Sequence, residues 1–237
     1  MCTLSFLLES GGYELFFSRD ERRSRAAARP PRLERAAEAR FLAPRDPEAG
    51  GTWLAANEHG VTLALLNRYG VTHPGSDFES RGRLVLELAS ARSLRAVEAQ
   101  LRGRSLGRVR PFDLAVFEPD RPVACIGWDG RVLTLERAAS APLCSSAVAD
   151  SEARAARRAR FAEHCAASGA PTTHSLAAFH REHAPARGAL SPCMHRADAR
   201  TVSLSRVRVT RERVALSYAA GSPCRARFGR ELELARA

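Results

Sequence analysis

The sequence predicts an α+β protein with antiparallel sheets and helices packed on their outer faces, in one domain spanning residues 1–237. Three observations predict this class. Short apolar segments occur in pairs joined by turn residues, as in β-hairpins. Segments with helical periodicity separate these pairs, and no internal repeat or low-complexity linker divides the chain. Hydrophobic residues make up 45% of the chain, which is enough for a sizeable core.

The N-terminal segment predicts a β-hairpin. Its apolar runs, residues 3–9 and 13–19, are joined by Ser10-Gly11-Gly12, where glycine allows the positive φ of a tight turn. The following residues, 19–40, are rich in charge and contain Pro30-Pro31. Because proline has no N–H to donate to a sheet, this segment is not expected to form a central strand. We expect a loop with a helical piece.

The middle of the chain predicts a second hairpin and a helix. Residues 52–57 and 61–67 are apolar strands around the turn Glu58-His59-Gly60. Residues 90–103 place three apolar side chains on one helical face, and Gly103 ends that helix. Three short strands are expected next, and Asp129-Gly130 is a strong hairpin turn between the last two; the strands are residues 112–118, 122–128 and 131–137.

The C-terminal part predicts two helices and a closing hairpin. Residues 152–168 form an alanine-rich helix, and residues 173–184 form a second one that is capped near Thr172 or Thr173. Residues 201–210 and 213–221 are strands joined around Arg211-Glu212.

Charge alone does not define a partner. The formal net charge is +11, but all 37 cationic residues are arginines, and they are scattered among acidic residues. Abundant arginine and alanine together are typical of GC-rich codon usage. We therefore expect no nucleic acid partner, whereas an acidic ligand remains possible.

The cysteines predict free thiols in a reducing cytoplasm. The chain has six cysteines without a CxxC pair, and no secretory segment or membrane-length apolar run is present. Cys193 and His195 are spaced to chelate a metal ion, but such a pair needs two further ligands. We expect neither a metal nor another cofactor.

Cys2 has two possible interpretations. It is either an accident of the start of the chain, or, after removal of Met1, an N-terminal residue that carries both a thiol and an α-amine. An α-amine has a pKa near about 8, so it can accept a proton from a nucleophile at neutral pH. The predicted hairpin brings Cys2 close to Arg19 and Asp20, which are either a solvated ion pair or part of a site.

Four stretches together resemble one protein family, named for an NRDE motif and for transport and Golgi organisation. They are MCTLSF, FFSRDERRSR, PRDPEAGGTWLAANEHGVTLALLNRYG and SPCMHRADARTVSLS. The family is similar to the N-terminal-nucleophile amidohydrolases, and within them to the choloylglycine hydrolase and penicillin acylase group. The resemblance covers nearly the whole chain and implies a four-layer αββα sandwich of antiparallel sheets.

The resemblance also implies roles for individual residues. Cys2 would attack an amide carbonyl while its own amine takes the proton, Arg19 would favour the thiolate, and Asp20 would hold the amine. Asn67 and Arg68, at the end of the second hairpin, are the candidates to line the pocket and to offer a backbone N–H to the oxyanion, and Asn67 would help to stabilise it.

Other residues of the second hairpin have structural alternatives. Trp53 is a residue of the core or a wall of the substrate pocket. Asn57 is expected to shape the turn that follows it, and Gly50 and Gly51 to permit a close backbone approach.

The chain departs from the family pattern at two places. Ser18 stands where the family has asparagine, and Ser145 or Ser146 must replace an asparagine side-chain donor near the oxyanion. Arg196 is a further candidate for substrate binding, whereas His195 is expected to be a surface or core-edge residue.

These observations lead to a primary function and an alternative. The primary one is an N-terminal cysteine amidohydrolase or acyltransferase that acts on a non-peptide C–N bond of a small amide or acyl ligand. The alternative is a non-catalytic module that binds or traffics a small hydrophobic ligand, such as an acyl, lipid or haem-like molecule.

Overall fold

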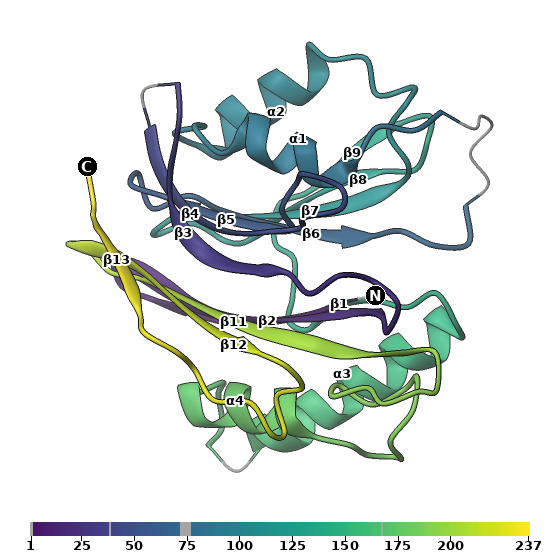
Figure 1. The fold of residues 1–237 in the computed structure, drawn as a ribbon. Coiled ribbons are helices and arrows are strands. Elements are labelled where there is room, and N and C mark those ends of the chain that lie inside the picture. Colours follow the sequence, from purple (N-terminus) through teal and green to yellow (C-terminus); the bar gives the residue numbers. More distant parts are fainter. Residues whose placement is uncertain (1, 38, 72–76, 167) are drawn as a thin grey trace.

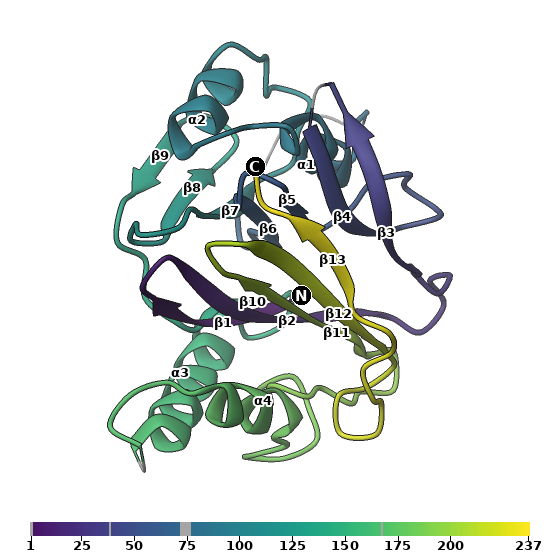
Figure 2. The same cartoon turned by 90° about the vertical axis from the view of Figure 1, so that its left-hand side faces the viewer.

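The computed structural model describes residues 2–37, 39–71, 77–166 and 168–237. Two antiparallel sheets lie face to face, with helices α1 and α2 on one outer side and α3 and α4 on the other (Figures 1 and 2). The layers therefore follow the order αββα, as predicted.

The first sheet carries both chain ends of the described residues. Its strands follow the order β10-β1-β2-β11-β12-β13, and each neighbouring pair is antiparallel. Their bounds are β1 Cys2–Glu9, β2 Gly12–Arg22, β10 Leu143–Ser145, β11 Ala199–Val209, β12 Arg213–Ala220 and β13 Leu232–Ala235.

The second sheet is built from the middle of the chain, and its strands lie side by side in sequence order, with helices α1 and α2 in the connection between β6 and β7. Its strands are β3 Arg29–Ala36, β4 Ala39–Arg45, β5 Leu54–Asn57, β6 Thr62–Asn67, β7 Phe112–Phe117, β8 Ala124–Trp128 and β9 Leu133–Glu136.

The helices cover the outer faces of the two sheets. They are α1 Arg81–Leu88, α2 Leu94–Arg102, α3 Asp150–Ala166 and α4 Thr173–Arg181. Thr172 caps α4 as predicted, since its side chain accepts a hydrogen bond from the backbone N–H of Ser175. No helix among the described residues is long and apolar enough to cross a membrane.

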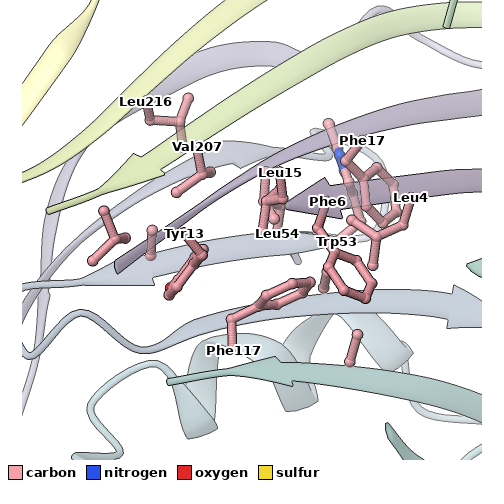
Figure 3. Packing of buried hydrophobic residues seen from close by; sticks show 14 of the residues in the cluster. Leu4, Phe6, Tyr13, Leu15, Phe17, Trp53, Leu54, Phe117, Val207 and Leu216 are labelled. Carbon is pink, nitrogen blue, oxygen red and sulfur yellow. The ribbon is translucent and has the colours of Figure 1, made fainter. Parts of the chain in front are cut away.

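The main hydrophobic core lies between the sheets. Alternate residues of β1 and β2 point into it because successive side chains of a strand project to opposite faces. The rings of Phe6 and Phe117 pack edge to face, with a distance of 5.2 Å between their centroids. Figure 3 shows the labelled members of this core: Leu4, Phe6, Tyr13, Leu15, Phe17, Trp53, Leu54, Phe117, Val207 and Leu216.

The four predicted hairpins are confirmed, but the interpretation of residues 19–40 is wrong. This segment continues β2 and then forms strand β3 instead of a helical piece. The proline rule still holds, because β3 is an edge strand of its sheet. Helix α1 and strands β4, β10 and β13 were not anticipated from the sequence.

A cysteine cleft between the two sheets

A cleft of about 420 Å³ opens where β1 begins and β2 and β6 end. Both sheets and the start of α1 contribute to its walls. Five of the eight predicted site residues border this cleft: Cys2, Arg19, Asp20, Trp53 and Asn67. The cleft is called the Cys2 cleft below.

Cys2 lies in the middle of a row of three residues across the first sheet. It is paired with Arg19 on β2 and with Ser145 on β10. Opposite residues of antiparallel strands project to the same face, so all three side chains point toward the space between the sheets.

Burial dominates the chemistry of the Cys2 thiol. Only 7% of the residue is exposed, and this burial raises the pKa of the thiol. The negative charge of Asp20 also raises this pKa, whereas the positive charge of Arg19 and the backbone N–H of Asp20 lower it without outweighing burial. The expected thiolate-stabilising effect of Arg19 is therefore present but is the weaker influence.

Arg19 is held rigidly at the cleft wall. Its Nη2 lies 2.9 Å from Asp46 Oδ2 and 3.0 Å from Glu21 Oε2. Its guanidinium carbon lies 4.4 Å from the ring centroid of Trp53, in a cation–π contact. Asp46 is bound in turn by Arg25, with a distance of 2.7 Å between Nη2 and Oδ2. Trp53 is therefore both a core residue and part of the cleft wall.

Asp20 directs its carboxylate toward the helical side of the first sheet. Its Oδ1 accepts a hydrogen bond of 2.6 Å from Thr201 Oγ1, and its Oδ2 lies 3.4 Å from Nη2 of Arg157. These contacts fix the carboxylate next to the start of β1. Its predicted contact with the α-amine of Cys2 depends on the removal of Met1, which lies outside the described residues.

Arg157 on α3 is a site component that the sequence analysis missed. Its side chain is fully buried. Nη1 donates to Thr3 Oγ1 at 2.6 Å and Nη2 donates to the carbonyl of Ala189 at 3.1 Å, in addition to the contact with Asp20. Arg157 thus connects the first residues of β1 to the end of β2.

A sequence signal for Arg157 does exist. Ala153 and Phe161 are buried residues of α3, and Arg157 lies midway between them at helical spacing. An arginine on the buried face of an amphipathic helix needs a polar partner in the core, so its position alone points to a buried polar site.

Ser18 does not border the Cys2 cleft. Its Oγ lies 2.7 Å from Nδ1 of His180 on α4, and Nε2 of the same ring lies 2.9 Å from Ser5 Oγ. The replacement of the family asparagine at this position therefore changes a contact between the sheet and α4. It does not remove a donor from the cleft.

The structure brings Asn67 to the cleft but places Arg68 elsewhere. Asn67 Nδ2 donates to Tyr69 Oη at 3.0 Å. The backbone N–H of Arg68 donates to the carbonyl of Pro111 at 3.2 Å, and Arg68 is not among the residues that border the cleft, so a role for Arg68 at the oxyanion stays a prediction. The Arg68 side chain pairs with Asp113 at 3.0 Å and borders a separate hollow of about 160 Å³.

The remaining two candidates also differ in position. Ser145 is fully buried beside Cys2, and its Oγ has no hydrogen-bond partner among the described residues. Ser146 uses its Oγ to donate to the carbonyl of Val148. Arg196 lies in the turn before β11, where it pairs with Asp198 at 2.9 Å, and it is not among the residues that border the cleft.

The structural predictions for the second hairpin are confirmed at Asn57 and Gly51. Oδ1 of Asn57 accepts hydrogen bonds from the backbone N–H groups of His59 and Val61, so Asn57 shapes the turn. A Cβ at Gly51 would lie 2.4 Å from the carbonyl carbon of Gly82, which is the predicted close backbone approach. Gly50 shows no such approach, because the nearest atom to a Cβ there would be a side-chain nitrogen of Arg83 at 3.9 Å.

Two further arginines give the cleft a positive wall. Arg81 and Arg110 border it, and neither forms an ion pair with an acidic residue in the described part of the chain. Burial and the charge of Arg110 lower the pKa of the Arg81 guanidinium. Arg81 Nη1 donates to the carbonyl of Pro111 at 2.9 Å. Neighbouring cations without acidic partners indicate a place for an anionic group.

Comparison with known proteins supports the same fold. A family model described as transport and Golgi organisation 2 matches residues 1–177. A C2A mutant of the conjugated bile acid hydrolase from Clostridium perfringens is structurally similar with a TM-score of 0.61, 12% identity and coverage of 99% of this chain and 92% of that chain. Penicillin V acylase from Agrobacterium tumefaciens gives a TM-score of 0.55, 9% identity and coverage of 93% and 83%. No curated protein sequence matches the chain. These similarities confirm the predicted N-terminal-nucleophile hydrolase fold.

Proposed function

The chain belongs to the transport and Golgi organisation 2 family, and we propose that it is an N-terminal-nucleophile amidohydrolase or acyltransferase that acts through Cys2. Its substrate would be a small molecule with a non-peptide C–N amide bond. The observation that supports this most strongly is that Cys2, Arg19, Asp20, Trp53 and Asn67 border one cleft. Fold similarity alone does not assign an activity, so the proposal rests on these residues.

The raised pKa of the thiol indicates which group must activate it. A buried neutral thiol needs a base when it attacks, and burial outweighs the charge of Arg19. Removal of Met1 would place an α-amine on the nucleophilic residue itself. The ordinary pKa of such an amine is about 8. In this mechanism the amine takes the thiol proton while the sulfur bonds to the carbonyl carbon. The resulting ammonium then protonates the leaving nitrogen, and water or a second acceptor releases the acyl group.

Donors for the oxyanion are available on both sides of Cys2. The side-chain amide of Asn67 has two N–H groups, and the hydrogen bond to Tyr69 uses one of them. Ser145 Oγ, directly opposite Cys2, has no other partner among the described residues and can donate one hydrogen bond. Ser145 would thus serve where the family has an asparagine.

The cleft walls indicate a substrate with an apolar part and a negative charge. Trp53 and Leu65 supply apolar surface, and Arg81 and Arg110 supply positive charge. A carboxylate or phosphate on the substrate would meet these two cations, since arginine binds both groups through paired hydrogen bonds.

Covalent labelling tests the role of Cys2. Intact-mass measurement should show loss of Met1, and an N-acyl substrate should leave an acyl group on Cys2 as a thioester. Cys2→Ala should abolish both the thioester and turnover. Cys144→Ala is the matched control, because Cys144 is also buried and lies on the neighbouring strand opposite Thr3. Retention of Met1, or a Cys2 thiol no more reactive than the other five, would contradict the proposal.

Replacement of Arg81 tests the predicted substrate charge. Arg81→Gln should raise the KM for anionic amides by about 10- to 100-fold, because it removes one hydrogen bond between charged groups. It should leave the KM for neutral amides unchanged. Arg83→Gln is the control, because Arg83 is an exposed residue of the same helix that does not border the cleft. Equal effects on anionic and neutral substrates would show that Arg81 acts only in folding.

Two observations favour the alternative of a non-catalytic binding module. Cys2 is buried with a raised thiol pKa, and the backbone N–H of Arg68 is already bonded, so the site is less reactive than an optimal one. Binding of an anionic acyl ligand that survives Cys2→Ala, together with no turnover by the wild-type protein, would establish this function instead.

A further inference from the structure

A second cluster of reactive side chains lies on the opposite side of the first sheet from the core. Its members are His183, Cys193, His195 and Cys224, and their ligand atoms all lie within 4.8 Å of one another. They come from three segments: the residues that follow α4, the loop before β11, and the loop after β12. None of the four is among the residues that border the Cys2 cleft.

Two of the distances in this cluster match those of a tetrahedral metal site. Nε2 of His195 lies 3.5 Å from Sγ of Cys193 and 3.5 Å from Sγ of Cys224. With Zn–S bonds of about 2.3 Å and Zn–N bonds of about 2.05 Å, tetrahedral geometry separates sulfur and nitrogen ligands by about 3.5 Å. Both nitrogen–sulfur distances therefore already have the required length.

An independent observation concerns His183. Its Nε2 is buried and has no hydrogen-bond partner among the described residues. Its ring centroid lies 5.2 Å from that of His195. A buried polar atom without a partner is costly, and a metal ion at the centre of the cluster would satisfy it.

We propose that these four residues bind a zinc ion. Two imidazole nitrogens and two thiolate sulfurs are a ligand set that selects zinc in tetrahedral geometry. Binding replaces the two thiol protons, which are released to solvent, so the two thiolates balance the double positive charge of the ion.

The site would be structural, because four protein ligands leave no open position for substrate. It would fasten the loop before β11 to the end of the helical layer. The backbone N–H of Met194, next to Cys193, donates to Thr201 Oγ1 at 2.8 Å, and Thr201 Oγ1 donates to Asp20. The ion would thereby support the position of Asp20 beside the Cys2 cleft without contacting it.

Metal analysis of untagged protein, purified under reducing conditions, tests this proposal. We expect about one zinc ion per chain and a loss of at least about tenfold in zinc affinity in Cys224→Ser and in His183→Gln. Cys165→Ser is the matched control, because Cys165 is also a partly buried free cysteine but lies on α3, outside the cluster. It should retain the full zinc content.

Two measurements on the wild-type protein keep the test valid if a variant fails to fold. Cobalt added to metal-free protein should give the intense visible bands of a tetrahedral site and a sulfur-to-cobalt charge-transfer band. Zinc binding should release about two protons per ion. Octahedral cobalt spectra, equal zinc content in Cys224→Ser and wild type, or a Cys193–Cys224 disulfide in protein that takes up no zinc after reduction would each overturn the proposal.

Discussion

The buried imidazole of His180 makes a testable contribution to the pH dependence of stability. The ring lies between Ser5 on β1 and Ser18 on β2, so it joins α4 to the two strands that carry Cys2, Arg19 and Asp20. Burial, together with the positive charge of Arg157, lowers its pKa from 6.5 to about 3. The folded protein therefore holds this ring in its neutral form across the range in which an unfolded histidine becomes charged.

The sign and size of the effect follow from proton linkage. Below pH 6.5 the unfolded chain binds a proton at residue 180, whereas the folded chain does not until the pH is near 3. The stabilising effect of the neutral ring is thus complete above pH 6.5 and is lost as the pH falls toward 3. At about pH 5, one such group lowers the free energy of unfolding by about 2 kcal/mol.

Urea unfolding of wild type and His180→Gln at a series of pH values measures this contribution. His183 and His195 also have lowered pKa values caused by burial, so only the difference between the two proteins reports His180. Between about pH 7 and 5, the free energy of unfolding of the wild type should fall by about 2 kcal/mol more than that of the variant. His174→Gln, at an exposed position of the same helix, should behave as wild type. Parallel pH profiles for wild type and His180→Gln would refute the assigned pKa shift.

Two further substitutions test how the second hairpin is fixed. Gly51→Ala should lower the free energy of unfolding by about 3 kcal/mol, because the new Cβ would lie 2.4 Å from the backbone of Gly82. At Gly70 no atom of the described residues lies within 4 Å of such a Cβ, so Gly70→Ala should lower it by only about 1 kcal/mol, for its positive φ. Asn57→Ala should lower the free energy of unfolding by about 3 kcal/mol. The Asn57 side chain donates hydrogen bonds to the carbonyls of Ala89 and Ala91, and its Oδ1 accepts two more. Asn67→Ala, which loses one partly buried hydrogen bond, is the comparison for Asn57. Urea unfolding measures all four, and equal costs within either pair would contradict the structural explanation.

The sequence predicted best those elements whose determinants lie close together along the chain. Each confirmed hairpin has its turn residues and apolar strands within a short stretch, so period and turn chemistry are sufficient. Strand β3 shows the opposite case. It is an edge strand that Arg45 and Glu34 stabilise by an ion pair, and Leu33 on it is exposed. An edge strand held by charge has no apolar alternation, and its arginines resemble those of a solvated loop.

The cleft residues show the same difference between local and long-range determinants. Cys2 and Arg19 were expected together because the register of one hairpin decides their pairing. Ser145 became a neighbour of Cys2 only through β10, which is a short strand far along the chain. Arg157 required knowledge of which face of α3 packs on the sheet. Long-range pairing and helix orientation depend on the whole fold, and a single sequence gives little information about either.

The proposed zinc cluster also depends on long-range pairing. Cys193 and His195 are neighbours in sequence, and the expectation of no metal depended on the lack of two further ligands nearby. Antiparallel pairing of β11 with β12 brings the loop after β12, with Cys224, next to the loop before β11. The end of α4 adds His183, because the backbone N–H of Cys193 donates to the carbonyl of Glu182 at 2.9 Å. On its other side β11 pairs with β2, and this pairing holds Thr201 against Asp20. Metal removal should therefore change the Cys2 cleft through Asp20, and a zinc-free protein with unchanged Cys2 reactivity would show that the two sites are independent.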